Sequence, residues 1–114
     1  MYISGIKATE QIFKVNLESK KITQVTNGQH DYTWFSPSQG TLIGIKMAIN
    51  MAFEIFTIEP KTGEETQITF INQNIYDNIT LGETQQRWMK TVDGKDMLVQ
   101  VILPPNFDET KKYP

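Results

Sequence analysis

The sequence repeats itself with a period of 43 residues. Shifted by that distance without a gap, residues 11–15 align with residues 54–58, and residues 23–26 align with residues 66–69. Identities fall at the pairs Ile12/Ile55, Phe13/Phe56, Thr23/Thr66, Gln24/Gln67 and Thr26/Thr69. Because the apolar positions keep their phase across the shift, the match favours a true repeat over a chance likeness of two hairpins.

Each copy of the repeat contains short runs of β-branched and aromatic residues separated by turn residues, which is the pattern of strands. We expect nine strands, at residues 2–7, 11–17, 21–26, 32–36, 41–47, 53–59, 66–71, 87–91 and 97–103. Only residues 47–52 are ambiguous, because Met47, Ala48, Met51 and Ala52 fall at helical spacing. A long hairpin loop is the favoured prediction there, and a single helical turn is the alternative.

A period in the low forties with several strands per repeat is typical of β-propeller blades. Residues 31–76 then form one complete four-stranded blade, and residues 1–30 form an incomplete blade without its first strand. Residues 77–114 follow as a linker and a hairpin. The predicted fold class is therefore all-β, a partial β-propeller of about one and a half blades plus a C-terminal β-hairpin. Since a propeller normally has about four to eight blades, we expect a piece of a longer protein.

Composition excludes several classes of function. The 11 Lys and Arg against 13 Asp and Glu leave a net charge of −2, so the chain has no basic footprint for nucleic acid. No Cys and a single His argue against zinc, iron–sulfur, thiol and disulfide chemistry, and we expect no cofactor and no metal. The longest nearly apolar stretch, residues 47–56, is too short for the roughly 20 residues of a membrane span.

The residues that could carry catalysis are few. Ser4, Ser19, Ser36 and Ser38 lie in strand or turn contexts, and none sits in Gly-x-Ser-x-Gly. The single histidine, His30, is followed by Asp31 in a turn region, and we interpret it as a solvated loop residue rather than a base. Glu64 and Glu65 are adjacent and face opposite ways in a strand, so they form no carboxylate dyad.

Three further groups have a structural and a functional interpretation. Asp93 with Asp96 could bind a cation weakly, but a role in the hairpin turn is favoured. The aromatic residues could form a ligand platform, but packing between blades is favoured for Trp34, Phe35, Phe53 and Phe56. Lys111-Lys112 is interpreted as a solvated lead-in rather than a phosphate site.

Two motifs resemble a known family. Residues 34–40, Trp-Phe-Ser-Pro-Ser-Gln-Gly, resemble a Trp-Ser-Pro-Asp-Gly blade signature, with Phe35 inserted and Ser38-Gln39 in place of Asp. Residues 87–114 include Pro-Pro-Asn-Phe-Asp at 104–108 and Lys-Lys-Tyr-Pro at 111–114. They resemble the junction between the propeller and the α/β-hydrolase domain in serine peptidases of the prolyl oligopeptidase and dipeptidyl-peptidase IV family. The sequence of residues 54–114 is most similar to bacterial dipeptidyl-peptidase V-like members.

The resemblance implies a non-catalytic part of a dipeptidyl-peptidase-type serine exopeptidase. The triad would lie beyond Pro114, so no catalytic residue is expected here and the chain alone should be inactive. The partners implied are the remaining blades and the hydrolase domain, with peptide substrate only in the full-length peptidase, which the family suggests is periplasmic or secreted. The propeller would restrict the access of substrate to the active site, and the apolar segment 47–53 could help to shape the access route.

The alternative is a stand-alone periplasmic propeller-like binding or scaffold module. In either case the isolated chain would leave apolar faces and strand edges uncovered, so we expect it to self-associate or swap strands.

Overall fold

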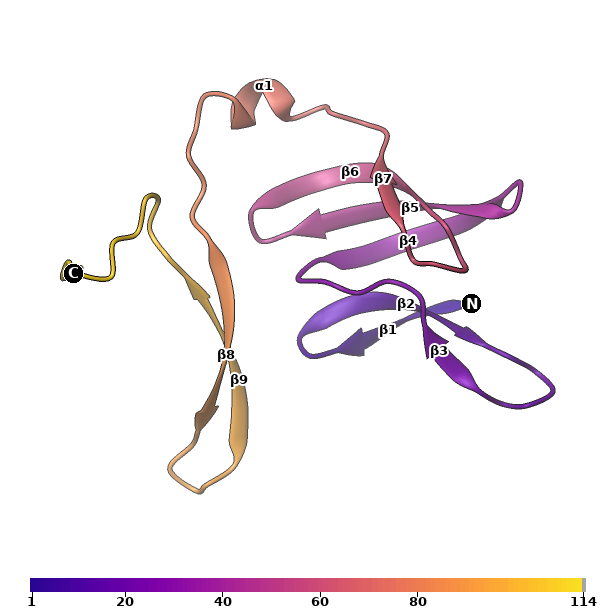
Figure 1. Ribbon diagram of the computed structural model, residues 1–114, viewed down its shortest axis with the longest axis horizontal. Coiled ribbons are helices and arrows are strands. Elements are labelled where there is room, and N and C mark those ends of the chain that lie inside the picture. The colour runs from indigo at the N-terminus through magenta and orange to yellow at the C-terminus, as the bar shows by residue number, and fades with distance from the viewer. Residues whose placement is uncertain (114) are drawn as a thin grey trace. The chain divides into compact units, whose positions relative to one another are not determined.

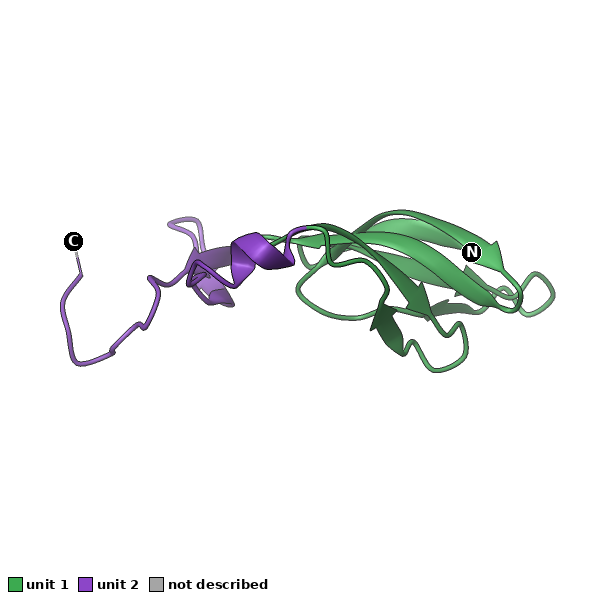
Figure 2. Cartoon of the chain, turned by 90° about the horizontal axis from the view of Figure 1, so that it is seen from above, with its two compact units in different colours: residues 1–71 green, residues 72–114 purple. Residues whose placement is uncertain are grey.

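The computed structural model describes residues 1–113, in which nine strands form three antiparallel sheets (Figure 1). The chain divides into two compact units, Met1–Ile71 and Asn72–Pro114 (Figure 2). Sheets of three and four strands belong to the first unit, and a two-stranded sheet belongs to the second. This confirms the predicted all-β fold class, and each of the nine expected strands overlaps an observed one.

In the first unit, the three-stranded sheet contains β1 (Tyr2–Ile6), β2 (Thr9–Val15) and β3 (Ile22–Gln24) in that order. The four-stranded sheet has the order β4 (Asp31–Ser38), β5 (Thr41–Ala48), β6 (Met51–Ile58) and β7 (Glu65–Gln67). Neighbours in each sheet are also neighbours in sequence, so short turns suffice to connect them.

Residues 47–52 form neither a long loop nor a helical turn, which corrects both expectations. Strand β5 continues to Ala48, which pairs with Met51 at the start of β6, so only Ile49 and Asn50 form the turn. On its other side Met47 pairs with Asp31 of β4. Strand partners on both sides of β5 override the local helical spacing, as tertiary contacts commonly do with short ambiguous runs.

The sequence repeat corresponds to a repeated hydrogen-bond arrangement. The hydroxyl of Thr26 accepts the backbone N–H of Ile12 at 2.9 Å, and the hydroxyl of Thr69 accepts that of Ile55 at 2.8 Å. Each threonine follows the short last strand of its sheet, so its side chain continues the hydrogen bonding where the backbone ladder stops. We call this contact the threonine bridge.

Neighbouring side chains of the threonine bridge also repeat. The threonine hydroxyl donates to Gln11 in the first copy, at 2.8 Å, and to Glu54 in the second. The side-chain amides of Gln24 and Gln67 donate to the carbonyls of the same threonines, at 2.8 and 2.7 Å. The repeated residues are therefore the ones that complete the backbone hydrogen bonding of each sheet.

The core of the first unit lies between its two sheets. Ile12 from β2 packs with three buried residues of the other sheet, Tyr32, Leu42 and Ile58, and Ile3, Val25 and Phe35 pack around them. Gly44 of β5 makes room for the Tyr32 ring, because a Cβ at this position would lie 2.8 Å from a ring carbon. The close approach explains why the central strand carries a glycine here.

The second unit consists of a short helix and a hairpin. Helix α1 (Gln73–Tyr76) precedes β8 (Thr84–Lys90) and β9 (Asp96–Ile102), which pair along their full length. Gly94 follows Asp93 in the turn of this hairpin and has a φ of +80°, a conformation that suits glycine. None of the helical segments in residues 1–113 meets the length and apolarity required of a membrane span.

Candidate functional site

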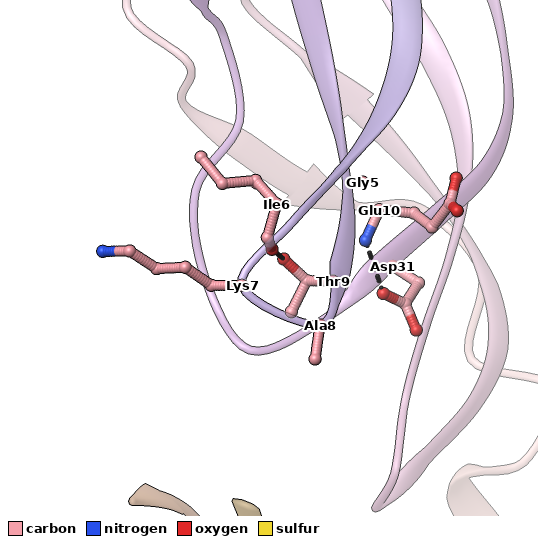
Figure 3. Close-up of a pocket in the computed structure, with 7 residues that line it drawn as sticks. All are labelled: Gly5, Ile6, Lys7, Ala8, Thr9, Glu10 and Asp31. Carbon is pink, nitrogen blue, oxygen red and sulfur yellow. Dashed lines mark hydrogen bonds between the residues drawn. The ribbon is translucent and has the colours of Figure 1, made fainter. Parts of the chain in front are cut away.

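A shallow depression of about 440 Å³ lies where β1 turns into β2 (Figure 3). Two of its polar side chains are engaged in hydrogen bonds within the protein. The hydroxyl of Thr9 donates to the carbonyl of Ile6 at 2.8 Å, and Asp31 accepts the N–H of Glu10 at 2.7 Å. The Lys7 side chain points away from these groups. The depression therefore presents no pairing of a nucleophile with a base.

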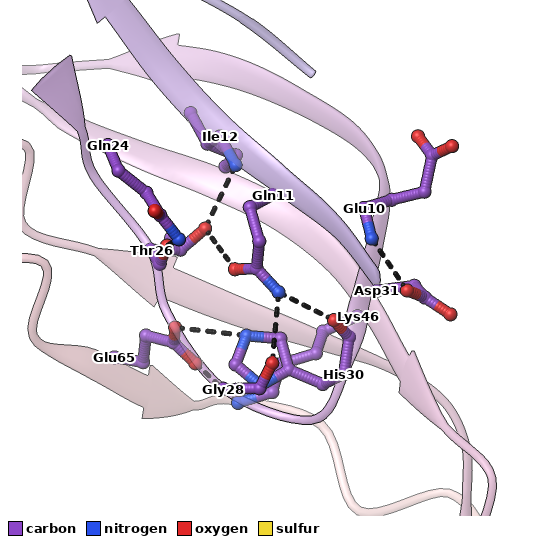
Figure 4. Close-up of polar contacts among 10 residues, drawn as sticks. All are labelled: Glu10, Gln11, Ile12, Gln24, Thr26, Gly28, His30, Asp31, Lys46 and Glu65. Carbon is purple, nitrogen blue, oxygen red and sulfur yellow. Dashed lines mark hydrogen bonds and ion pairs between the residues drawn. The ribbon is translucent and has the colours of Figure 1, made fainter. Parts of the chain in front are cut away.

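A charged cluster in the first unit is a more organised site. It combines His30, which precedes β4, Lys46 of β5 and Glu65 of β7 (Figure 4). One carboxylate oxygen of Glu65 lies 3.3 Å from Nε2 of His30, and the other accepts a hydrogen bond from Nζ of Lys46. The three side chains are only 11–14% exposed. We call this group the His30–Lys46–Glu65 cluster.

The electrostatics of the cluster keep Glu65 ionised. Burial alone would raise the pKa of Glu65, but the hydrogen bonds and charges of His30 and Lys46 outweigh it and hold that pKa below its ordinary value. Burial, together with the nearby charge of Glu65, raises the pKa of Tyr32, so its phenol stays protonated. Lys46 also lies 4.3 Å from the centre of the Phe56 ring, a favourable cation–π distance.

A buried glutamine fixes the segment that carries His30. The side-chain amide of Gln11 donates to the carbonyl of His30 at 2.7 Å and to that of Gly28 at 3.3 Å (Figure 4). Gln11 is fully buried and also accepts from Thr26. The Gln11 side chain thus links the threonine bridge of the first sheet to the segment that carries His30 of the charged cluster. This segment connects the two sheets, and Gln11 holds it against the first one.

The cluster corrects the interpretation of His30 as a solvated loop residue. Its imidazole is 11% exposed and packs edge-on against Tyr32, with ring centres 5.5 Å apart. In the part of the chain that the structure describes, its side chain has no hydrogen bond to a serine hydroxyl. Glu64 is exposed whereas Glu65 is largely buried, so the two carboxylates face different surroundings. The arrangement suits structural cohesion rather than acid–base catalysis.

The aromatic residues split between core and surface. Phe35 packs against the core and Phe56 is 7% exposed, as the packing interpretation predicts. Trp34 and Phe53 are 51% and 56% exposed within residues 1–113, so packing between blades stays a prediction for these two residues. The register places Trp34 beside Ile45 in a row across the outward face of the four-stranded sheet. This face is an exposed apolar surface.

The acidic residues of the second unit stabilise its hairpin. Asp93 forms an ion pair with Lys95 at 2.8 Å and accepts the hydroxyl of Thr91, and these hydrogen bonds lower the pKa of Asp93. Asp96 pairs with Lys90 at 2.7 Å across the strands. No group of three or more His, Asp or Glu able to hold a metal occurs within residues 1–113. Turn formation therefore accounts for both aspartates.

Sequence reasoning missed the charged cluster because its members lie far apart in the chain. The repeat contained one usable signal: the 43-residue shift places Glu65 on Ile22. Ile22 is 58% exposed, whereas Glu65 is largely buried. A charged residue that replaces an apolar one in an otherwise matching repeat indicates a different environment, but it does not identify the partners.

The chain is similar in sequence to one segment of larger peptidases. No family model matches it. It is 37% identical over 113 residues to dipeptidyl-peptidase 5 of Porphyromonas gingivalis and 34% identical to that of Porphyromonas endodontalis. Each match covers 99% of this chain and 16% of the relative, so the chain spans about a sixth of the length of the curated relatives it matches.

Solved structures share the fold. The AtxE2 isopeptidase matches 98% of this chain and 17% of its own, with a TM-score of 0.78 and 12% identity. Pyrococcus horikoshii acylaminoacyl peptidase matches 95% of this chain and 16% of its own, with a TM-score of 0.72 and 21% identity. The chain is homologous to one segment of dipeptidyl-peptidase 5, and this confirms its resemblance to peptidases of the prolyl oligopeptidase family.

Proposed function

We propose that this chain is a non-catalytic part of a dipeptidyl-peptidase-type serine peptidase, in which its sheets belong to a propeller that gates access to the active site. The observation that carries the proposal is the match to dipeptidyl-peptidase 5 along 99% of the chain. Residues 1–30 and 31–76 are assigned to an incomplete and a complete blade, and residues 77–114 to the linker and the hairpin that leads into the catalytic domain.

The outward face of the four-stranded sheet supports this assignment. Ile55 of that face is the repeat counterpart of Ile12, which is fully buried between the two sheets. Ile68, on the same repeat, is the counterpart of Val25, which packs against the core, yet Ile68 is 49% exposed. The outward face of the second sheet therefore carries apolar residues at the same repeat positions that the first sheet uses to pack against the second. Another sheet of the same peptidase is the partner that these residues suit.

A segment exchange tests the proposal. The homologous segment of Porphyromonas gingivalis dipeptidyl-peptidase 5 is replaced by this chain, and hydrolysis of dipeptidyl chromogenic substrates is measured. We expect the chimera to be active and the purified 114-residue chain to be inactive. A chimera that is monodisperse but inactive, or hydrolysis by the purified chain, would contradict the proposal.

The contribution of the outward face is tested in the same chimera. Replacing Ile55 by Glu places a charge where we propose that a second sheet packs, so it should abolish assembly and activity. Lys61→Glu, in an exposed turn, is the matched control and should leave activity unchanged. Equal activity of both variants would show that this face packs against nothing.

A further inference from the structure

Asn27 and Gly28 lie in the segment that connects the two sheets of the first unit. This segment, residues 25–30, is outside both β3 and β4, and Asn27 and Gly28 are exposed there. Asn27 is also the only asparagine in the sequence that is followed by glycine. An asparagine before a glycine is the most prone to spontaneous deamidation, because glycine has no Cβ that would obstruct attack by its own backbone nitrogen. Sequence and exposure therefore single out Asn27 as a modification site.

The groups that would react are not engaged in other contacts. Ring closure uses the backbone nitrogen of Gly28 and the side-chain amide of Asn27, and within residues 1–113 neither group takes part in a hydrogen bond. Asn16 differs, because its side-chain oxygen accepts the N–H of Glu18 at 3.0 Å and that of Ser19 at 2.9 Å. The fold thus restrains the amide of Asn16 and leaves that of Asn27 unrestrained.

The packing of His30 accounts for the glycine at position 28. A Cβ on Gly28 would lie 2.6 Å from both Cε1 and Nδ1 of His30, so any side chain there would push the imidazole away from Glu65 (Figure 4). The φ of Gly28, +153°, is also one that residues with a side chain rarely adopt. The His30–Lys46–Glu65 cluster therefore requires the residue that makes Asn27 reactive.

We propose that Asn27 deamidates spontaneously in the folded protein, and that the isoaspartate product separates His30 from Glu65. The backbone nitrogen of Gly28 attacks Cγ of Asn27, so that the N–Cγ bond forms and the Cγ–Nδ2 bond breaks. The proton of the Gly28 N–H leaves with the amide nitrogen as ammonia, and a cyclic succinimide remains. Water then opens the ring: attack at Cγ gives aspartate, and attack at the main-chain carbonyl gives isoaspartate.

Isoaspartate lengthens the main chain between two points that the fold holds in place. On one side, Thr26 is fully buried and donates its hydroxyl to Gln11 at 2.8 Å. On the other side, the amide of Gln11 donates to the carbonyls of Gly28 and His30, at 3.3 and 2.7 Å. Because the main chain of isoaspartate passes through its Cβ and Cγ, it inserts one extra carbon between these points. The contacts on both sides then cannot persist together, and His30 is displaced from Glu65.

The first experiment measures deamidation of the full chain at neutral pH. Peptide mapping by mass spectrometry detects conversion, and labelling by an isoaspartyl methyltransferase identifies isoaspartate. We expect Asn27 to convert at least about tenfold faster than Asn50, which lies in the β5–β6 turn and precedes Met51.

A synthetic peptide of residues 23–31 gives the rate without the fold. The folded chain should be slower than this peptide by no more than about tenfold, because restriction of the backbone is the main obstacle that folding adds. Conversion of the peptide without conversion of the folded chain would overturn the proposal, and so would equal rates at Asn27 and Asn50.

The second experiment follows His30, the single histidine in the sequence, by NMR. Its ring lies edge-on to that of Tyr32, with ring centres 5.5 Å apart, so the unmodified chain should show NOEs between the two rings. In the purified isoaspartate form these NOEs should disappear, while those between the paired residues Leu42 and Ile58 persist. Retention of the His30–Tyr32 NOEs, or loss of both sets through unfolding, would overturn the proposal.

Two variants separate the new charge from the longer main chain. Asn27→Asp introduces the charge without the extra carbon, so the NOEs between His30 and Tyr32 should persist. Asn27→Gln keeps an amide that would have to close a larger ring, so it should show no conversion and no loss of NOEs during the same incubation. Loss of the NOEs in Asn27→Asp would assign the displacement to charge and overturn the proposal. The inference does not depend on the peptidase assignment, so an inactive chimera leaves it standing.

Discussion

Ile12 and Ile55 occupy equivalent positions in the two copies of the repeat, and their surroundings differ. Both donate their N–H to the threonine of their own sheet, at 2.9 and 2.8 Å. Ile12 is fully buried between the sheets, whereas Ile55 is only partly covered on the outward face. The repeat therefore preserves the hydrogen bonds within a sheet, while burial depends on whether another sheet lies against it.

The largest expected effect comes from truncating these two isoleucines. Ile12→Ala should destabilise the chain by about 3 kcal/mol, because it removes buried methyl groups and leaves a cavity. Ile55→Ala should cost about 1 kcal/mol, because part of its surface is already in water. Urea denaturation followed by circular dichroism measures both. Equal losses would indicate that the outward face is covered in solution, which is the outcome expected if the chain self-associates.

The threonine bridge should contribute similarly in both copies. Thr26→Val leaves the N–H of Ile12 and the side chain of Gln11 without this partner, which should cost about 2 kcal/mol. Thr69→Val should cost at least as much, because its hydroxyl donates to the buried carboxylate of Glu54. The same denaturation measurement applies. A negligible loss of stability for Thr69→Val would show that the threonine bridge stabilises only the copy of the repeat that lies against the core.

Glu65 of the charged cluster replaces Ile22 of the first copy of the repeat, so the effect of pH on stability should distinguish the two positions. Glu65→Gln should destabilise the chain by about 1.5 kcal/mol at neutral pH, because Lys46 and His30 lose a charged partner. The pKa of Glu65 is lowered in the folded state, so its contribution is present above its ordinary value of 4.5 and is lost as the pH falls below it.

Unfolding of the wild type and of Glu65→Gln is therefore compared between pH 3 and 7. The difference in free energy of unfolding should shrink toward zero as the pH falls below 4.5, the ordinary pKa of a glutamate. Ile22→Gln, at the equivalent exposed position of the first copy, is the matched control and should show no such dependence on pH. A constant difference down to pH 3 would contradict the assignment of Glu65.

The smallest expected effect distinguishes the two hairpin turns. Ala8 adopts a φ of 59°, which is unfavourable for a residue with a side chain, so Ala8→Gly should stabilise the chain by about 0.5–1 kcal/mol. Asn50, in the equivalent turn between β5 and β6, has no positive φ, so Asn50→Gly should give no gain. Thermal unfolding measures both, and a gain at Asn50 would contradict this difference between the turns.

Local patterns predicted much of the strand content. Alternating apolar residues such as Phe13 and Val15, and turn residues such as Asp93-Gly94, act within a few residues of the chain, so the strand positions follow from them. The exception was residues 47–52, where the spacing of Met47 and Met51 suits a helix as well as a loop. Pairing of β5 with both of its neighbours decided that segment.

The candidate site could not be predicted in the same way. His30, Lys46 and Glu65 are separated by many residues, and nothing in their local sequences connects them. The face on which Trp34 lies also depends on the packing of one sheet on another, since alternation defines two faces of a strand but not which of them is covered.

By itself, the sequence determined the 43-residue repeat, the all-β class and the resemblance to the peptidase family, because these depend on local preferences and on shared residues. Only the tertiary structure decided that the His30 side chain is largely buried beside Glu65 and that Trp34 is exposed within residues 1–113. The physical reason is that burial and charge pairing depend on distances between segments remote in sequence, and folding alone sets those distances.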